Sequence, residues 1–223
     1  QAFAQVARQV SVGLQNLGLL PEARQRLHEM DTLLEFSRKL GDFTPESILS
    51  TLLDSALQIV PAAQSGWAGL WDERAHELLP QVALGYSDCA SLVGMHLAAP
   101  GSLPSAESVL PLRVYASGQP LLAPEVQFAR DYNLPSDDLL RYRRATGGRL
   151  PVSSLIVPVQ LAEHTVGVLT LENFSSQDPF SVEDENMVLA LALQAALALE
   201  NARLLQSAEG RAATLAALTR VAG

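Results

Sequence analysis

The sequence predicts an α+β domain built around a mainly antiparallel sheet. Short strand patterns occur in pairs separated by tight turns, at 65–86 and at 152–173, which is typical of antiparallel hairpins. Helical patterns enclose these pairs, one before them at 44–60 and one after them from 181 onward. A hydrophobic content of 48% over 223 residues is ample for a packed core.

The first helix of the domain is expected at 44–60. The residues GDF (41–43) interrupt a preceding helical pattern, Thr44 suits the N-cap, and Pro45 suits the first helical position. The apolar stripe of this helix would consist of four residues at helical spacing: Ile48, Leu52, Ala56 and Ile59.

Two strands are expected next, at 65–72 and 77–86, around the turn ERAHE. Trp67 and Trp71 lie four residues apart on the first strand, so both side chains should point to the same side of the sheet. Residues 87–102 are expected to be loop with short elements. A short helix closed by Gly118 follows at 108–118, and then a brief strand, PLLAPEV.

The last third of the chain begins with an irregular, more polar stretch at 127–151. Strands are expected at 152–161 and 165–173, joined by the tight connection AEH. Ser181 then caps the final helix, with Asp184 as a capping-box partner three residues later. The acidic residues at 183–185 complement the positive end of that helix.

Composition excludes several classes of function. The net charge of −9 does not favour nucleic acid as a main partner, because gripping phosphates requires clustered Lys and Arg. The single cysteine, Cys89, excludes an internal disulfide framework and a thiolate zinc site. The most apolar run, 187–199, is shorter than the roughly 20 residues of a membrane span. We expect a cytoplasmic chain with no membrane partner and, because it begins with Gln1, one that is part of a longer protein.

The two ends of the chain resemble each other. Residues 7–20 (ending in VGLQNLGLL) align without a gap to 192–205 (ending in LALENARLL), with six identities in fourteen positions. Matching Asn16 with Asn201 and Gln9 with Gln194 in one register is harder to obtain by chance than matching Ala and Leu. This repeat indicates a tandem array with a period near 185 residues.

Both copies carry a heptad pattern. The second copy includes Leu197, Asn201, Leu204, Ala208 and Leu215 at alternating spacings of four and three, and the first copy includes Asn16 and Leu19 in the same phase. A single Asn in such a seam fixes register, because a slipped pairing leaves the amide unsatisfied. Two interpretations stay open: a helix that packs on its own domain, and a helix that pairs with a second chain.

The repeat predicts the domain organisation. Residues 1–20 would close a preceding module, 21–40 would be a connector helix, 41–205 a complete module, and 206–223 the start of the next connector. Pro21 is expected to kink or interrupt the first copy of the helix.

Three stretches resemble the GAF domain family: ASGQPLLAPEV (116–126), SSLIVPVQLAEHTVGVLTLEN (153–173) and FSVEDENMVLALALQAALALENARLL (180–205). The resemblance covers about 31–206. It implies a six-stranded antiparallel sheet, with dimerising N- and C-terminal helices on one face and a pocket roofed by loops and short helices on the other. It also implies tandem GAF modules in a bacterial signalling protein with an output domain such as a histidine kinase, a diguanylate cyclase or a phosphatase.

The specialised GAF subtypes do not fit these residues well. A bilin is usually attached to a thiol next to His, whereas Cys89 is followed by Ala90. Reduction of free methionine sulfoxide depends on several cysteines in this family, and the chain has one. The cyclic-nucleotide signature Asn-Lys-Phe-Asp-Glu is absent, and only His96 is placed to lie in a pocket wall as a haem ligand. No cofactor, no metal and no catalytic residue is expected.

A ligand pocket, if present, would include part of 127–151, which carries five of the fifteen cations and two of the four tyrosines. Arg offers a fork of donors to an anion, and Tyr stacks on planar ligands. The candidate ligand-binding residues are Trp67, Arg113, Tyr115, Tyr132, Arg141 and Tyr142. The alternative is a solvated loop in which the arginines pair with neighbouring aspartates.

We therefore expect a non-enzymatic sensory or regulatory module that works as a parallel homodimer and contacts neighbouring GAF and output domains in the same chain. It would bind an unidentified small molecule, mediate dimerisation, or do both, and relay its state through its last helix. The alternative is a purely structural dimerisation module without a ligand. A cavity with convergent polar groups favours the first alternative, and a dry, packed sheet face favours the second.

Overall fold

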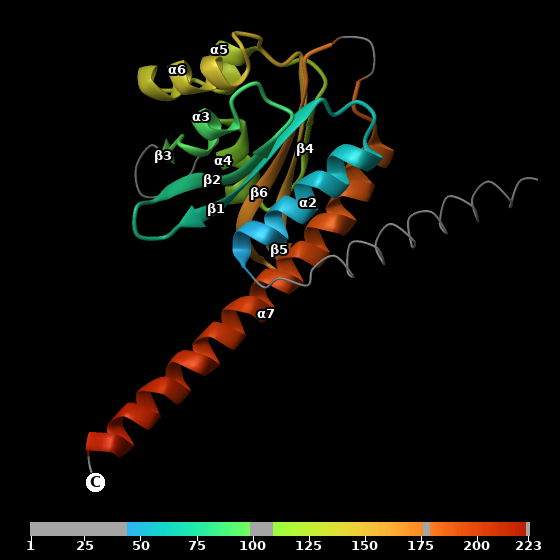
Figure 1. Ribbon diagram of the computed structural model, residues 1–223. Helices are drawn as coiled ribbons and strands as arrows, with labels where there is room; N and C mark the ends of the chain where they lie inside the picture. Colours follow the sequence, from blue (N-terminus) through green and yellow to red (C-terminus); the bar gives the residue numbers. More distant parts are fainter. Residues whose placement is uncertain (1–43, 99–108, 176–178, 222–223) are drawn as a thin grey trace, which may run out of the picture. The chain divides into compact units, whose positions relative to one another are not determined.

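The computed structural model describes residues 44–98, 109–175 and 179–221. A six-stranded antiparallel sheet with the order β3-β2-β1-β6-β5-β4 forms its centre (Figure 1). The strands are β1 (Ser65–Asp72), β2 (Glu77–Leu84), β3 (Leu97–Ala98), β4 (Leu121–Ala123), β5 (Ser153–Leu161) and β6 (His164–Asn173). The predicted α+β class and antiparallel sheet are confirmed.

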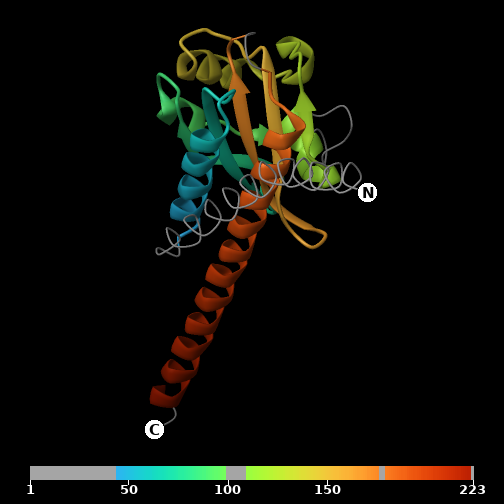
Figure 2. The same ribbon diagram turned by 90° about the vertical axis from the view of Figure 1, so that its right-hand side faces the viewer.

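Helices cover both faces of the sheet. Two lie side by side on one face, α2 (Pro45–Ile59) and α7 (Val182–Val221), and α7 runs on beyond the end of the sheet (Figures 1 and 2). The opposite face carries the short helices α3 (Cys89–Val93), α4 (Leu110–Ser117), α5 (Phe128–Asp131) and α6 (Ser136–Ala145). The predicted helices over residues 1–40 lie outside the described residues.

N-terminal capping residues begin helices α2 and α7 at the predicted positions. The Thr44 hydroxyl accepts a hydrogen bond from the Ser47 N–H at 3.3 Å, with Pro45 at the first helical position. The Asp184 carboxylate accepts from the Ser181 N–H at 2.8 Å, while the Asp184 N–H donates to the Ser181 hydroxyl at 3.1 Å. This reciprocal pair is the predicted capping box.

The packing of α7 explains its apolar composition. Val188, Leu191, Ala192, Ala195 and Ala196 are buried, and the helix contacts α2 and β5. By length and composition alone, Val182–Leu204 is apolar enough to cross a membrane, which corrects the expectation from the shorter run 187–199. The contacts with α2 and β5 bury part of the apolar surface of this helix.

Close approach of two strands requires glycine at Gly167. A Cβ atom there would lie 2.1 Å from the carbonyl oxygen of Gly69 on the neighbouring strand β1. No L side chain fits that distance. The pair therefore fixes how tightly the two central strands pack.

A hydrophobic core cluster lies on the sheet face opposite α2 and α7. Trp67 is buried in it and Trp71 packs against it, so the expectation that both indoles point to one side is confirmed. Residues 127–151, expected to be irregular, instead contain α5 and α6. Helix α6 begins directly after Pro135 and buries Tyr142 and Ala145, while most of its other residues stay in contact with solvent.

Candidate functional site

Three tyrosine hydroxyls converge on one buried carboxylate, that of Glu172. Tyr86 donates its O–H to Oε2 at 2.7 Å, and Tyr142 donates to Oε1 at 3.0 Å. Tyr132 donates to Oε1 at 3.2 Å, and its oxygen lies 3.2 Å from the hydroxyl of Ser154. We call these five residues the tyrosine–Glu172 cluster.

The cluster joins segments that are far apart in the chain. Tyr86 follows β2, Tyr132 is the C-cap of α5, Tyr142 lies in α6, and Glu172 is the penultimate residue of β6. The ring of Phe128 stacks on that of Tyr132 at 4.9 Å between centroids and tilts against that of Tyr142 at 4.8 Å. Helices α5 and α6 are thereby bound to the strand that precedes α7.

Burial and hydrogen bonding act in opposite directions on Glu172. Its side chain has no exposed surface, and this burial raises the pKa of the carboxyl to about 7, while the three tyrosine donors lower it. Burial first, and then the neighbouring Glu172 charge, raise the pKa values of Tyr86, Tyr132 and Tyr142 well above that of a free phenol. The tyrosines therefore stay neutral donors, and the charge of the cluster rests on Glu172.

Thr170 places a further hydroxyl group on the same face of the sheet. It stands two residues before Glu172 on β6, so both side chains point to the same side of the strand. Among the described residues, the buried Thr170 hydroxyl has no hydrogen-bond partner. An unpaired buried hydroxyl carries a desolvation cost that a bound polar molecule would offset.

The predicted ligand-binding residues are not gathered in one place. Tyr132 and Tyr142 belong to the cluster, and Trp67 is buried in the core on the same face. The side chains of Arg113 and Arg141 are exposed, and the Arg141 guanidinium lies over Gly94.

Tyr115 lies elsewhere, stacked on Trp71 at 4.5 Å beside an open pocket described below. Glu172 and Ser154 were not anticipated. The signal that could have identified Glu172 is a carboxylate within the mostly apolar strand VGVLTLEN.

Two further expectations concern His96 and Cys89. The imidazole of His96, the histidine that the sequence left as a haem-ligand candidate, is 61% exposed and lies 2.8 Å from the Glu77 carboxylate, so it does not line an enclosed pocket. Cys89 is a free thiol at the start of α3. Within the described residues, no three His, Cys, Asp or Glu side chains are grouped to hold a metal ion.

The exposed side of α7 is also relevant to function. Four of its large apolar side chains are more than a third exposed: Val182 (62%), Leu193 (46%), Leu197 (39%) and Leu204 (48%). At 100° per residue they fall within an arc of roughly 60°. Asn201 is exposed beside them. Ala208 and Leu215 lie where only the helical backbone is described, and Asn16 and Leu19 lie outside the described residues.

Solved structures share this fold. The GAF domain of an Acinetobacter phosphoenolpyruvate-protein phosphotransferase superposes with a TM-score of 0.60 at 19% identity, covering 79% of this chain and 95% of that one. The second GAF domain of DevS from Mycobacterium smegmatis gives 0.53 at 18% identity, covering 75% and 99%. The free methionine-R-sulfoxide reductase of Neisseria meningitidis gives 0.58 at 16% identity, covering 79% and 91%.

These similarities show the fold, and the reductase among them is an enzyme built on it. The family model described as GAF domain matches residues 44–200, from the N-cap of α2 to the middle of α7. With its six-stranded antiparallel sheet between two helical layers, the chain belongs to the GAF domain family.

Proposed function

We propose that this GAF domain is a non-enzymatic regulatory module of a bacterial signalling protein, in which the tyrosine–Glu172 cluster relays the state of α5 and α6 to α7. The observation that carries the proposal is that Tyr132 and Tyr142 bond directly to Glu172 on the last strand before α7. Movement of α5 and α6 breaks these bonds and leaves a buried carboxylate short of donors. The position of β6 and its connection to α7 then changes.

A small polar molecule is the proposed trigger. The Glu172 carboxylate and the Thr170 hydroxyl are the polar groups that such a molecule would meet on the sheet face after α5 and α6 moved. The molecule shifts the equilibrium only to the extent that it binds the opened arrangement more tightly than the closed one. The phenols and the carboxylate offer both hydrogen-bond donors and acceptors to it.

Dimerisation through α7 is the second part of the proposal. The exposed stripe of Val182, Leu193, Leu197 and Leu204 would pack against the same stripe of a second chain, with Asn201 setting the register. A parallel pair of α7 helices would extend beyond the sheet, since α7 itself does so (Figure 2), and could carry the signal to a following domain. Changes at β6 would then reach the output domain as changes in helix pairing.

Sedimentation equilibrium tests the dimer. We expect the wild type to be a dimer and Leu197→Asp to be largely monomeric, because a charge at the helix seam must be desolvated. Leu140→Asp is the matched control, since Leu140 is 66% exposed on α6, away from the stripe. Equal dissociation of both variants, or a monomeric wild type, contradicts the proposal.

Distances between spin labels test the relay. A label at Ser207→Cys in a Cys89→Ser background reports the separation of the two α7 helices. We expect Tyr142→Phe, which removes one bond to Glu172, to shift or broaden that distance distribution. The control is Tyr115→Phe, outside the cluster.

The alternative function is a structural dimerisation module without a ligand. The filling of the sheet face by the buried rings of Trp67, Tyr86, Tyr132 and Tyr142 favours it. It predicts a stable dimer whose α7 separation is the same in the wild type and in Tyr142→Phe. Native mass spectrometry of the purified protein adds an independent measurement, since a reproducible extra mass released on denaturation supports the sensory module.

A further inference from the structure

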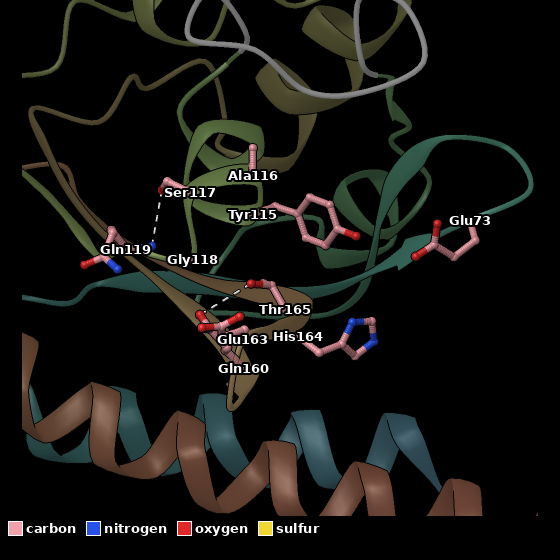
Figure 3. Close-up of a pocket in the computed structure, with 10 residues that line it drawn as sticks. All are labelled: Glu73, Tyr115, Ala116, Ser117, Gly118, Gln119, Gln160, Glu163, His164 and Thr165. Carbon is pink, nitrogen blue, oxygen red and sulfur yellow. Dashed lines mark hydrogen bonds between the residues drawn. The ribbon is translucent and has the colours of Figure 1, made fainter.

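A second site lies at the far end of β6 from Glu172. A pocket of about 560 Å³ opens between the C-terminus of α4 and the β5–β6 hairpin (Figure 3). Glu73, from the β1–β2 turn, also lines it. None of the residues of the tyrosine–Glu172 cluster is among its described lining residues.

The hairpin side of the pocket is held in place by Gln160. The Gln160 amide nitrogen donates to the carbonyl oxygen of Ala162 at 2.6 Å, and its Oε1 accepts from the Thr165 hydroxyl at 3.4 Å. Opposite it, Gly118 ends α4 with φ of +62°, and a Cβ atom there would lie 2.6 Å from Gln160 Oε1. These contacts fix the Gln160 and Thr165 side chains in the pocket before any ligand binds, which lowers the entropic cost of binding.

One wall of the pocket is aromatic. The ring of Tyr115 stacks on Trp71 at 4.5 Å with an interplanar angle of 20°. Burial first, and then the nearby Glu73 charge, raise the pKa of Tyr115 to about 12, so its phenol is neutral at physiological pH. The electron-rich face of such a ring attracts cations.

The charges around the pocket are negative. Glu73 and Glu163 are its two carboxylates, and none of its ten described lining residues is Lys or Arg. The chain as a whole carries a net charge of −9. This field repels anions and concentrates cations at the pocket mouth.

We propose that this pocket binds a small organic diammonium cation, with one ammonium group near Glu73 and the Tyr115 ring and the other near Glu163. The Gln160 and Thr165 oxygens and the neighbouring hydroxyl of Ser117 accept the remaining N–H donors. The proposal goes beyond the function assigned above, because it concerns a different ligand and a different part of the fold.

Isothermal titration calorimetry with putrescine tests the proposal on the full chain. We expect saturable binding to one site, and weaker binding of butylamine, which has a single charge. Glu73→Gln and Glu163→Gln should each weaken putrescine binding roughly two- to fivefold, as expected for exposed charge pairs. Tyr115→Leu should weaken it by a similar factor, because it removes the aromatic face.

The control is Glu46→Gln, which removes the same charge from α2, away from the pocket. An equal loss of affinity in Glu46→Gln would reveal diffuse attraction to an acidic protein and would overturn the proposal. Absence of saturable binding to the wild type overturns it as well, as does equal affinity for the uncharged butanediol. The comparison among putrescine, butylamine and butanediol uses only the wild type, so it does not depend on the folding of any variant.

Discussion

Tyr142 in α6 and Glu172 in β6, 30 residues apart in the sequence, meet through a hydrogen bond of 3.0 Å in a part of the molecule that solvent hardly reaches. The bond ties a helix on one side of the sheet to the strand that precedes the long helix on the other side. Its strength depends on the charge of Glu172, because a hydrogen bond to an ionised acceptor is stronger than one to a neutral group. Protonation of one carboxyl therefore changes how firmly α6 is held.

Glu172→Gln should change how stability depends on pH. The pKa of this carboxyl rises from its usual 4.5 in the unfolded chain to about 7 in the folded protein, so folding favours the protonated form. Below pH 4.5 the stabilising contribution is complete, and it declines as the pH rises and is lost above about pH 7. At about 1.4 kcal/mol per pH unit, the contribution is about 3 kcal/mol.

The measurement is urea denaturation of both proteins between pH 5 and pH 8. The free energy of unfolding of the wild type should fall relative to that of Glu172→Gln as the pH rises across this range. Carboxylates with lowered pKa values, such as Asp72 and Asp88, titrate in both proteins and cancel in the difference. A difference that is constant with pH would show that Glu172 titrates near its usual value.

Tyr142→Phe should destabilise the protein more at pH 8 than at pH 5. At pH 8 the lost hydrogen bond goes to a carboxylate, for which the cost is about 2 kcal/mol, and at pH 5 it goes to a neutral carboxyl, for which the cost is about 1 kcal/mol. Loss of this donor also raises the pKa of Glu172 further, since Tyr142 is one of the groups that lower it. Chemical denaturation at the two pH values, with Tyr115→Phe as the control, measures both effects; an equal cost at the two values would contradict the prediction.

The fold was predictable because its boundaries are set by local chemistry. Thr44 and Pro45 begin α2, and Gly118, with a positive φ, ends α4, as the sequence pattern indicated. Helix α6 was not predictable in the same way. Its sequence, SDDLLRYRRA, buries few apolar residues, and its position depends on the hydrogen bond from Tyr142 to the Glu172 carboxylate on the sheet face that it covers.

The candidate site was only partly predictable. Two tyrosines within a polar segment indicate a role for Tyr132 and Tyr142, but nothing in that segment indicates their partner, Glu172. Strand β6 is buried on both faces from Gly167 to Asn173, so hydrophobic alternation does not distinguish the side to which Glu172 points. The charges of Arg113 and Arg141 indicate an anion site, but both side chains are exposed.

Gly167→Ala should destabilise the sheet by about 2–3 kcal/mol, because the added methyl group overlaps the Gly69 carbonyl oxygen and the strands must separate. Gly148→Ala is an informative comparison. A Cβ atom at Gly148 meets nothing within 4 Å, but φ is +82°, so only backbone strain of about 1 kcal/mol is expected. Thermal and urea denaturation of both variants measure the difference, and a smaller loss in Gly167→Ala than in Gly148→Ala would contradict the assigned close contact.

Asn201→Leu should preserve folding and change association. In the proposed dimer Asn201 lies beside Leu197 and Leu204 on the exposed stripe of α7, where one polar residue restricts the number of chains and their register at some cost in stability. Leucine removes that restriction. We therefore expect either a dissociation constant of the dimer that is roughly tenfold lower or the formation of larger assemblies, since apolar burial replaces a desolvated amide.

Sedimentation velocity over a range of concentrations distinguishes these results, with circular dichroism to verify that the variant is folded. Gln127→Leu is the matched control, because it makes an exposed amide apolar beside α5, away from α7. If Asn201→Leu and the wild type have the same oligomeric state and the same dissociation constant, Asn201 does not lie in a pairing seam. In that case the terminal repeat reflects packing of α7 on its own domain, which is the other interpretation of the heptad pattern.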